Sequence, residues 1–191
     1  MSAGRLIRLA SLLATLAALW GAAAGTASAQ KTQTQAFFEQ RLLADRLTSK
    51  SIKTLLRSGG GFVDRGVVFR DLTGDKRDDA VVRVHSGGAA GVVAVYVFST
   101  ANRRGGRLRA IFRSQSLLRA STRVLKGVAS YRTSRYDPGD ELCCPARITQ
   151  STLEWDAAAR RMRVRERVTF VPPPEAQAPA APAPPSRARA G

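Results

Sequence analysis

Oxygen-bearing side chains stand at alternate positions in one short acidic stretch, which is the strongest candidate for chemistry in the sequence. Asp71, Thr73, Asp75 and Asp79 take positions 1, 3, 5 and 9, and Arg77 offers a backbone carbonyl at position 7. Calcium takes about six to eight hard oxygen ligands grouped round one point. The same spacing is typical of an Asx turn, in which Asp and Gly bond their own backbone without a metal. The residues therefore predict either a metal site or a self-bonded turn.

The stretch resembles the calcium loop of FG-GAP/VCBS-type propeller repeats, in which such acids precede an apolar strand. The sequence departs from that pattern at Thr73, where Asp or Asn is usual, and at Lys76, where Gly is usual. Only one such loop occurs, so a propeller built from these repeats is excluded. The resemblance implies Ca²⁺ as cofactor and these ligands: Asp71, Asp75, Asp79, Thr73 and the carbonyl of Arg77.

Arginines form the second candidate site. The chain has 31 Lys and Arg against 14 Asp and Glu, a net charge of +17. The last apolar run, Met162–Val171, alternates with Glu166 as an intruder on its apolar face, so its arginines are expected on the other face of a strand, with a second stripe on an earlier strand. The alternative is that arginine merely fills solvent-facing positions. We expect polyanion binding by Arg161, Arg163, Arg165, Arg167, Arg107 and Arg109.

The charge also restricts the class of partner. A strongly positive surface attracts polyanions over long distances. Nucleic-acid sites usually add stacking aromatics to a basic groove, and aromatic residues make up only 6% of this chain. The sequence therefore favours an anionic envelope polymer or lipid headgroups over nucleic acid, and we expect a monomer.

The cysteine pair and the single histidine are two further candidate sites. Cys143 and Cys144 are adjacent, and they can form a vicinal disulfide, pair with another chain or remain reduced and buried; a structural clamp of a turn is favoured over a redox function. His85 is the only histidine, and an enzyme or enzyme inhibitor would need it beside the acidic stretch and the cysteine loop. No nucleophile motif accompanies it, so a non-catalytic module is the main hypothesis and the enzyme or inhibitor is the alternative.

Residues 1–29 have the pattern of a secretory signal peptide. Arg5 and Arg8 precede an uncharged apolar run, and Ala27-Ser28-Ala29 is a small-residue cleavage site. The protein is therefore predicted to be secreted, and an uncleaved membrane anchor is the alternative. Residues 30–61 form a helical segment with a break near Ser49 and Ser51, and residues 172–191 form a disordered Pro/Ala-rich tail.

Residues 62–171 read as a β domain. Short apolar runs alternate with turn residues, which leaves little room for crossover helices and favours antiparallel pairing. Val92–Phe98 is apolar on both faces and is expected at the centre of the sheet. The predicted class is α+β, with one N-terminal helix or two short ones packed on a largely antiparallel sheet of about five to seven strands. The predicted strands are Val67–Phe69, Ala80–His85, Val92–Phe98, Leu108–Arg113, Val124–Tyr131, Arg147–Trp155 and Met162–Val171.

The order of features along the chain also resembles that of secreted proteins from actinobacteria with GC-rich genomes. The features are a helix, the acidic turn, a glycine turn at 87–88 and the Cys-Cys-Pro loop. This resemblance implies secretion and carries no activity.

Overall fold

The computed structural model describes residues 31–101 and 106–172 of the 191-residue chain. The predicted signal peptide, residues 1–29, and the predicted tail beyond Pro172 lie outside the described residues. The described part contains two helices and nine strands. Neither described helix has the length and apolar character needed to cross a membrane.

Two short helices come first, and each begins at a side-chain cap. α1 spans Gln33–Ala44, and Thr32 and Gln35 form a reciprocal capping box at its start. α2 spans Lys50–Arg57, and the Ser49 hydroxyl accepts a hydrogen bond from its first turn. Ser49 is one of the two residues at which the sequence predicted a break.

Five strands form a first sheet in which every pairing is antiparallel. The strand order is β1-β3-β4-β5, and β2 pairs with the part of β3 that β1 leaves free. β5 is therefore an edge strand. The bounds are β1 Phe62–Val63, β2 Val68–Arg70, β3 Asp79–His85, β4 Val92–Ser99 and β5 Arg109–Gln115.

Four strands form a second antiparallel sheet in the order β6-β7-β8-β9, with β9 at one edge. The predicted antiparallel pairing is confirmed, but the prediction of a single sheet is wrong because the chain divides its strands between two. The bounds are β6 Ser121–Leu125, β7 Val128–Arg135, β8 Arg147–Asp156 and β9 Arg161–Phe170.

One predicted strand, Val124–Tyr131, is instead the hairpin of β6 and β7. Leu125 pairs with Val128, so only Lys126 and Gly127 connect the strands. Both residues have positive φ, 51° and 75°, as a type I′ turn requires. The turn reverses the chain in the middle of the apolar run.

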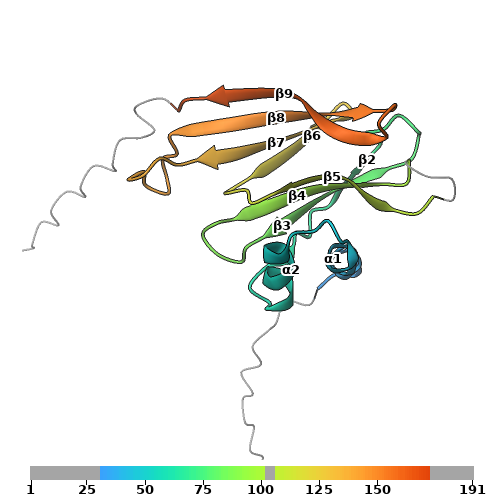
Figure 1. Ribbon diagram of the computed structural model, residues 1–191, viewed down its shortest axis with the longest axis horizontal. Coiled ribbons are helices and arrows are strands. Elements are labelled where there is room, and N and C mark those ends of the chain that lie inside the picture. The colour runs from blue at the N-terminus through green and yellow to red at the C-terminus, as the bar shows by residue number, and fades with distance from the viewer. Residues whose placement is uncertain (1–30, 102–105, 173–191) are drawn as a thin grey trace, which may run out of the picture. The chain divides into compact units, whose positions relative to one another are not determined.

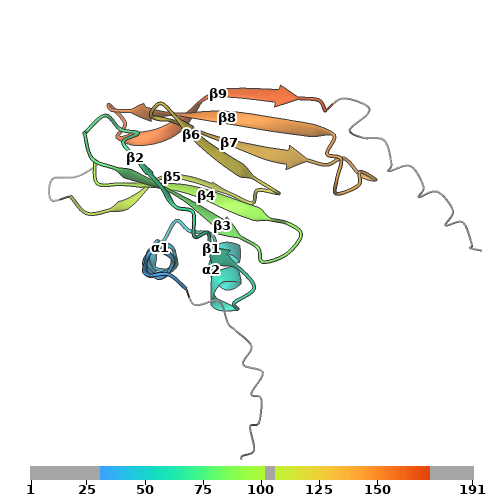
Figure 2. The same ribbon diagram turned by 180° about the vertical axis from the view of Figure 1, so that it is seen from behind.

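The strand β4 lies between two hydrophobic cores, as its two apolar faces predicted. Ala94, Tyr96 and Phe98 pack with residues of α1 and α2, whereas Val95 and Val97 pack with residues of the second sheet. Figures 1 and 2 show the same layering, with both helices on one side of the first sheet and the second sheet on the other.

Hydrogen bonds and an ion pair fasten the connection between the helices to β5. The Arg113 guanidinium donates to Asp45 Oδ2 from Nε at 2.9 Å and from Nη2 at 2.6 Å. The Gln115 side chain accepts from Ser49 N–H and donates to the Leu47 carbonyl. The C-terminal end of α1 is thereby held against an edge strand far away in sequence.

Candidate functional site

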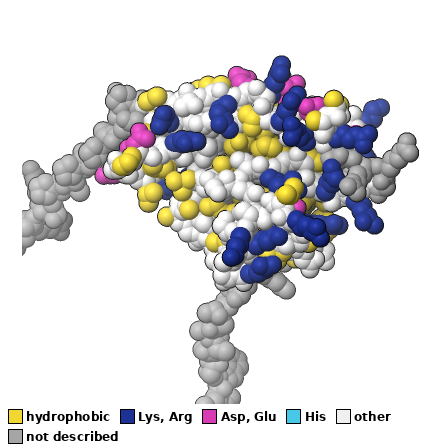
Figure 3. Space-filling model, viewed as in Figure 1, with side chains coloured by type: hydrophobic (Ala, Val, Ile, Leu, Met, Phe, Trp, Pro, Cys, Tyr) yellow, Lys and Arg dark blue, Asp and Glu magenta, His cyan; other side chains and the backbone are white. Residues whose placement is uncertain are grey.

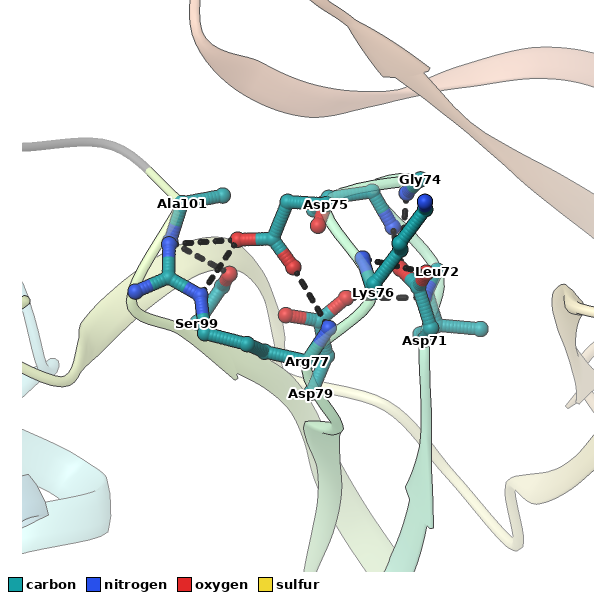
Figure 4. Close-up of polar contacts among 10 residues, drawn as sticks. Asp71, Leu72, Gly74, Asp75, Lys76, Arg77, Asp79, Ser99 and Ala101 are labelled. Atoms are coloured by element: carbon teal, nitrogen blue, oxygen red, sulfur yellow. Dashed lines mark hydrogen bonds and ion pairs between the residues drawn. The ribbon is translucent and has the colours of Figure 1, made fainter.

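The acidic stretch forms the loop between β2 and β3, and Asp71 organises it (Figure 4). Asp71 Oδ1 accepts the N–H groups of Thr73 at 3.1 Å and Gly74 at 2.7 Å, and Oδ2 accepts that of Lys76 at 2.9 Å. Desolvation opposes ionisation, but these N–H donors outweigh it and hold the pKa of Asp71 below its usual value. The carboxylate thus acts as the centre of an Asx-type turn.

The next two acids of the loop differ in their partners. Asp75 accepts the backbone N–H of Arg77 at 3.0 Å and forms an ion pair with its guanidinium, at 2.7 Å from Nη2 (Figure 4). Asp78 is exposed and has no hydrogen bond or ion pair within the described chain. Lys76, where the family pattern has Gly, adopts a positive φ of 63°.

Asp79 begins β3 and is almost completely buried, with 1% of its surface exposed. Its Oδ2 accepts the Leu72 N–H at 2.8 Å, which closes the base of the loop. Burial raises the pKa of Asp79 above its usual value, although a hydrogen bond from the Ser99 hydroxyl opposes the shift. The Thr73 hydroxyl is buried beside Asp79 and opposes the rise of the Asp79 pKa in the same direction as Ser99.

The loop therefore brings the predicted ligands Asp71, Thr73, Asp75, Arg77 and Asp79 into one turn but gives the three predicted carboxylate ligands separate partners. One is bonded to backbone N–H groups, one to a guanidinium, and one is buried at the start of a strand. Across residues 31–101 and 106–172, no group of three or more His, Cys, Asp or Glu is placed to hold a metal ion. Calcium binding, which the resemblance implies, stays a prediction.

His85 lies at the opposite end of β3 from the acidic loop. A strand of seven residues extends about 20 Å, so the alternative hypothesis, which needs the histidine beside the acids, does not match the geometry. The actual partner of His85 is Asp64, at 2.9 Å between Nε2 and Oδ2, and the Phe62 ring stacks on the imidazole. Arg83 also binds Asp64, at 3.0 Å.

The predicted arginine stripe on β9 is interrupted by a β-bulge. On β8, Leu153 pairs with Val164 of β9. The preceding residue, Thr152, pairs with Glu166, so Arg165 is an extra residue without a partner position. A slip of one residue moves all later side chains to the other face of the strand.

The bulge divides the four arginines between the two faces of the second sheet. Arg163 lies opposite Glu154 on the outer face, whereas Arg167 lies opposite Ser151, which is buried on the face toward the first sheet. The prediction that all four share one face is therefore wrong.

Two of the β9 arginines form ion pairs with acids of β8. Arg163 binds Asp156 at 2.9 Å, and Arg165 binds Glu154 at 3.1 Å. The arginine side chains of these pairs remain 62% and 74% exposed. Exposed pairs of this kind contribute about 0–1 kcal/mol, so another anion can replace the acid at little cost.

The second predicted stripe lies on the other sheet. Arg107 precedes β5 and Arg109 begins it, so these residues are not on a strand that pairs with β9. The two edge strands β5 and β9 nevertheless contact each other where the sheets meet. Of the six arginines predicted to bind polyanions, five lie on these two strands and Arg107 directly precedes β5.

The cysteine loop connects β7 to β8, and Cys143 and Cys144 form a vicinal disulfide within it. The Tyr136 hydroxyl and the Arg119 guanidinium both donate to the Leu142 carbonyl. Asp140 Oδ2 accepts the N–H groups at positions 137 and 146, both at 2.8 Å. The contacts are those of an ordered turn, in agreement with a structural role.

A pocket between α1 and β5 is the feature that sequence reasoning missed. It has a volume of about 460 Å³ and is lined in part by Arg41, Asp45 and Arg113. Residues 45 and 113 are 68 positions apart, so no local pattern indicates that they meet.

Comparison with known protein families, curated proteins and solved structures finds no match to this chain.

Proposed function

We propose that this protein is a secreted, non-catalytic module that binds linear anionic polymers of the cell envelope through its β5–β9 edge. The contact between β5 and β9 is the observation that carries this proposal. It joins two arginine sets that belong to different sheets. The residues of this edge are Arg107, Arg109, Arg161, Arg163, Arg165 and Arg167.

The charge of the edge supports an anionic partner. Figure 3 shows Lys and Arg side chains along the β9 side and over the helices, with Asp and Glu at fewer points. The arginines of both pairs with β8 acids are largely exposed, although Asp156 is only 14% exposed, and pairs that reach the solvent in this way are weak and screened by salt. A polymer with many anionic groups can therefore displace them.

The shape of the edge favours a linear partner over a compact one. β9 has ten residues, which extend to roughly 33 Å, and its arginines recur along that length. Side chains from both faces of an edge strand can reach the strand's open side, so the bulge does not prevent Arg163 and Arg167 from binding one polymer. On β9 the exposed aromatic ring is that of Phe170, at the end of the strand, and a single ring falls short of the series of stacking aromatics that single-stranded nucleic acids use.

An extracytoplasmic location supports the envelope as the source of the polymer. The N-terminal sequence pattern is that of a secretory signal, and disulfides persist in oxidising compartments. No observation favours a catalytic function, because His85 is separated from the acidic loop.

Binding of polyphosphate, measured by titration calorimetry at increasing salt, tests the proposal. We expect affinity to fall with ionic strength and to drop about tenfold in the double variant Arg163→Gln/Arg167→Gln, with a salt dependence reduced by about two counterions. The matched control is Arg123→Gln/Arg70→Gln, on edge strands β6 and β2 away from this edge. Phosphatidylcholine vesicles containing phosphatidylglycerol are the comparison surface.

Equal losses in the two double variants would reduce the binding to general surface charge and overturn the proposal. Stronger dependence of vesicle binding than of polymer binding on the β9 arginines would also overturn it, and would indicate a lipid surface as the partner.

A further inference from the structure

The pocket between α1 and β5 has walls that combine charge with apolar surface. Its charged residues are three arginines and one aspartate, and its apolar residues come from α1, the connection after it and the first sheet. A volume of about 460 Å³ is within the range of pockets that bind small molecules. The lining includes Arg41, Asp45, Leu47, Phe98, Arg109 and Arg113.

Asp45 is the one acid among the lining residues, and both of its carboxylate oxygens accept hydrogen bonds. Asp45 Oδ2 accepts both hydrogen bonds from Arg113, and Oδ1 accepts the N–H of Leu47 at 3.0 Å. Asp45 therefore neutralises one arginine and leaves the charges of Arg41 and Arg109 uncompensated within the pocket. The side chains of this pair are only 21% and 19% exposed, so one wall of the pocket is held in place.

Arg109 supplies an unused donor. Its Nε is buried from solvent and has no hydrogen-bond partner in the part of the chain that the structure describes. A buried N–H without an acceptor is unfavourable, and a donor on a charged group gains more than a neutral one when an acceptor is supplied. Because this Nε is inaccessible to solvent, an anionic oxygen in the pocket would reach it only after the Arg109 side chain, which lines the pocket, turns toward the ligand.

The rest of the pocket suits an apolar group. Phe98, itself 2% exposed, Ala110 and Leu108 line the side of the first sheet, and the largely exposed Leu47 lies at the pocket too. Arg41 lies over the Phe37 ring, at 5.1 Å from its centroid, with its guanidinium beside the apolar surface of α1. A ligand that is anionic at one end and apolar at the other matches both parts.

We infer that this pocket binds a small anionic amphiphile, whose carboxylate or phosphate head lies against Arg109 and Arg41 and whose short apolar chain lies over Phe98 and Leu47. This site shares Arg109 with the polymer edge, but it needs one head group and one apolar chain, whereas the edge needs many charges along a strand. It does not depend on the proposed function. Because the head would be partly buried, its binding is less sensitive to salt than polymer binding.

Titration calorimetry of the purified protein with hexanoate and with hexyl phosphate tests the inference, and hexanol is the uncharged control. We expect saturable binding of at least one anionic probe that persists at high salt, and the better probe identifies the head group. Arg109→Gln removes the charge but keeps a polar, hydrogen-bonding side chain, so affinity should fall about tenfold to hundredfold. Arg123→Gln, on the far edge of the second sheet, should bind as the wild type does.

A second variant keeps the test valid if Arg109→Gln alters the fold. Leu47 is 66% exposed, so Leu47→Glu should leave the unfolding midpoint nearly unchanged while placing a negative charge at the pocket. It should weaken the anionic probes more than hexanol, because both lose the apolar contact with Leu47 and only the anionic probes are repelled by the new charge. Absence of saturable binding, equal binding of hexanol, or unchanged affinity in both variants would each overturn the inference. Loss of polyphosphate binding with retention of hexanoate or hexyl phosphate binding would overturn the polymer proposal alone.

Discussion

Replacing Asp71 with Ala measures how far the acidic loop is held by its own hydrogen bonds. The substitution removes the acceptor of three backbone N–H groups, those of Thr73, Gly74 and Lys76. Loss of a comparable Asp cap at a helix N-terminus costs about 0.5–2 kcal/mol. Three donors are released here, but they lie near the surface, where water can replace the carboxylate. We therefore expect a loss of about 1–2 kcal/mol.

This loss converts to a measurable shift in the unfolding midpoint. For about 140 ordered residues the entropy of unfolding is about 0.3 kcal/mol/K, so the midpoint should fall by about 3–7 °C. Thermal unfolding followed by circular dichroism, in buffer with a chelator, measures the shift without any contribution from metal. Asp78→Ala is the matched control, because Asp78 belongs to the same loop and has no partner within the described chain. It should change stability by less than about 0.5 kcal/mol.

The pH dependence provides an independent check. The pKa of Asp71 is lowered from 3.8 in the folded state, so its stabilisation is fully present above that value. It is lost as the pH falls through the lower folded pKa, because the carboxylate is then protonated. The gap between wild type and Asp71→Ala should consequently persist at neutral pH and close in strong acid. Equal midpoints of wild type, Asp71→Ala and Asp78→Ala at pH 7 would refute the reasoning.

Three further predictions concern the same strand and its neighbours. If the loop binds calcium as its resemblance implies, excess calcium should raise the midpoint of the wild type but not of Asp75→Ala, and equal midpoints in calcium and chelator would contradict this. Burial raises the pKa of Asp79, so its stabilisation is present below 3.8 and lost as pH rises through the folded pKa. Asp79→Asn should thus melt at or above the wild-type temperature at pH 7, with the difference shrinking toward pH 4, and a gap that widened in acid would oppose this account. Gly87 has a φ of 72° and a Cβ there would collide with the Gly60 carbonyl, so Gly87→Ala should lower the free energy of unfolding by more than about 2 kcal/mol. Gly88→Ala, where a Cβ would meet open space, should lower it by less than about 1 kcal/mol. Denaturant unfolding compares the two variants, and similar losses of stability would contradict the predicted collision.

Local patterns were sufficient for the elements that one segment determines alone. Ser49 caps α2 because a side-chain oxygen at that position satisfies the N–H groups of the first turn, a contact within three residues. The position of β4 was equally predictable, since a strand that is apolar on both faces must be covered on both. Neither inference required knowledge of the strand order.

Longer-range features were not predictable in this way. The run Val124–Tyr131 has the composition of one strand, and only the Lys126-Gly127 pair, with two positive φ angles, divides it. Antiparallel pairing was evident from the short connections, but the division into two sheets depends on which strands meet. The same holds for the pocket at Arg109, whose lining comes from α1 and β5 and is assembled only by tertiary contacts.

The register of β9 shows why alternation in sequence is insufficient to assign a charged face. Four arginines at every second position imply one face only if each residue of β9 opposes one residue of β8. The single unpaired residue at Arg165 breaks that rule and sends Arg167 to the side opposite Arg163. A bulge also increases local twist, and β9 is the edge strand that contacts β5. The arginines are therefore better described as belonging to an edge than to a face, and a strand edge is a surface along which an extended polymer can lie.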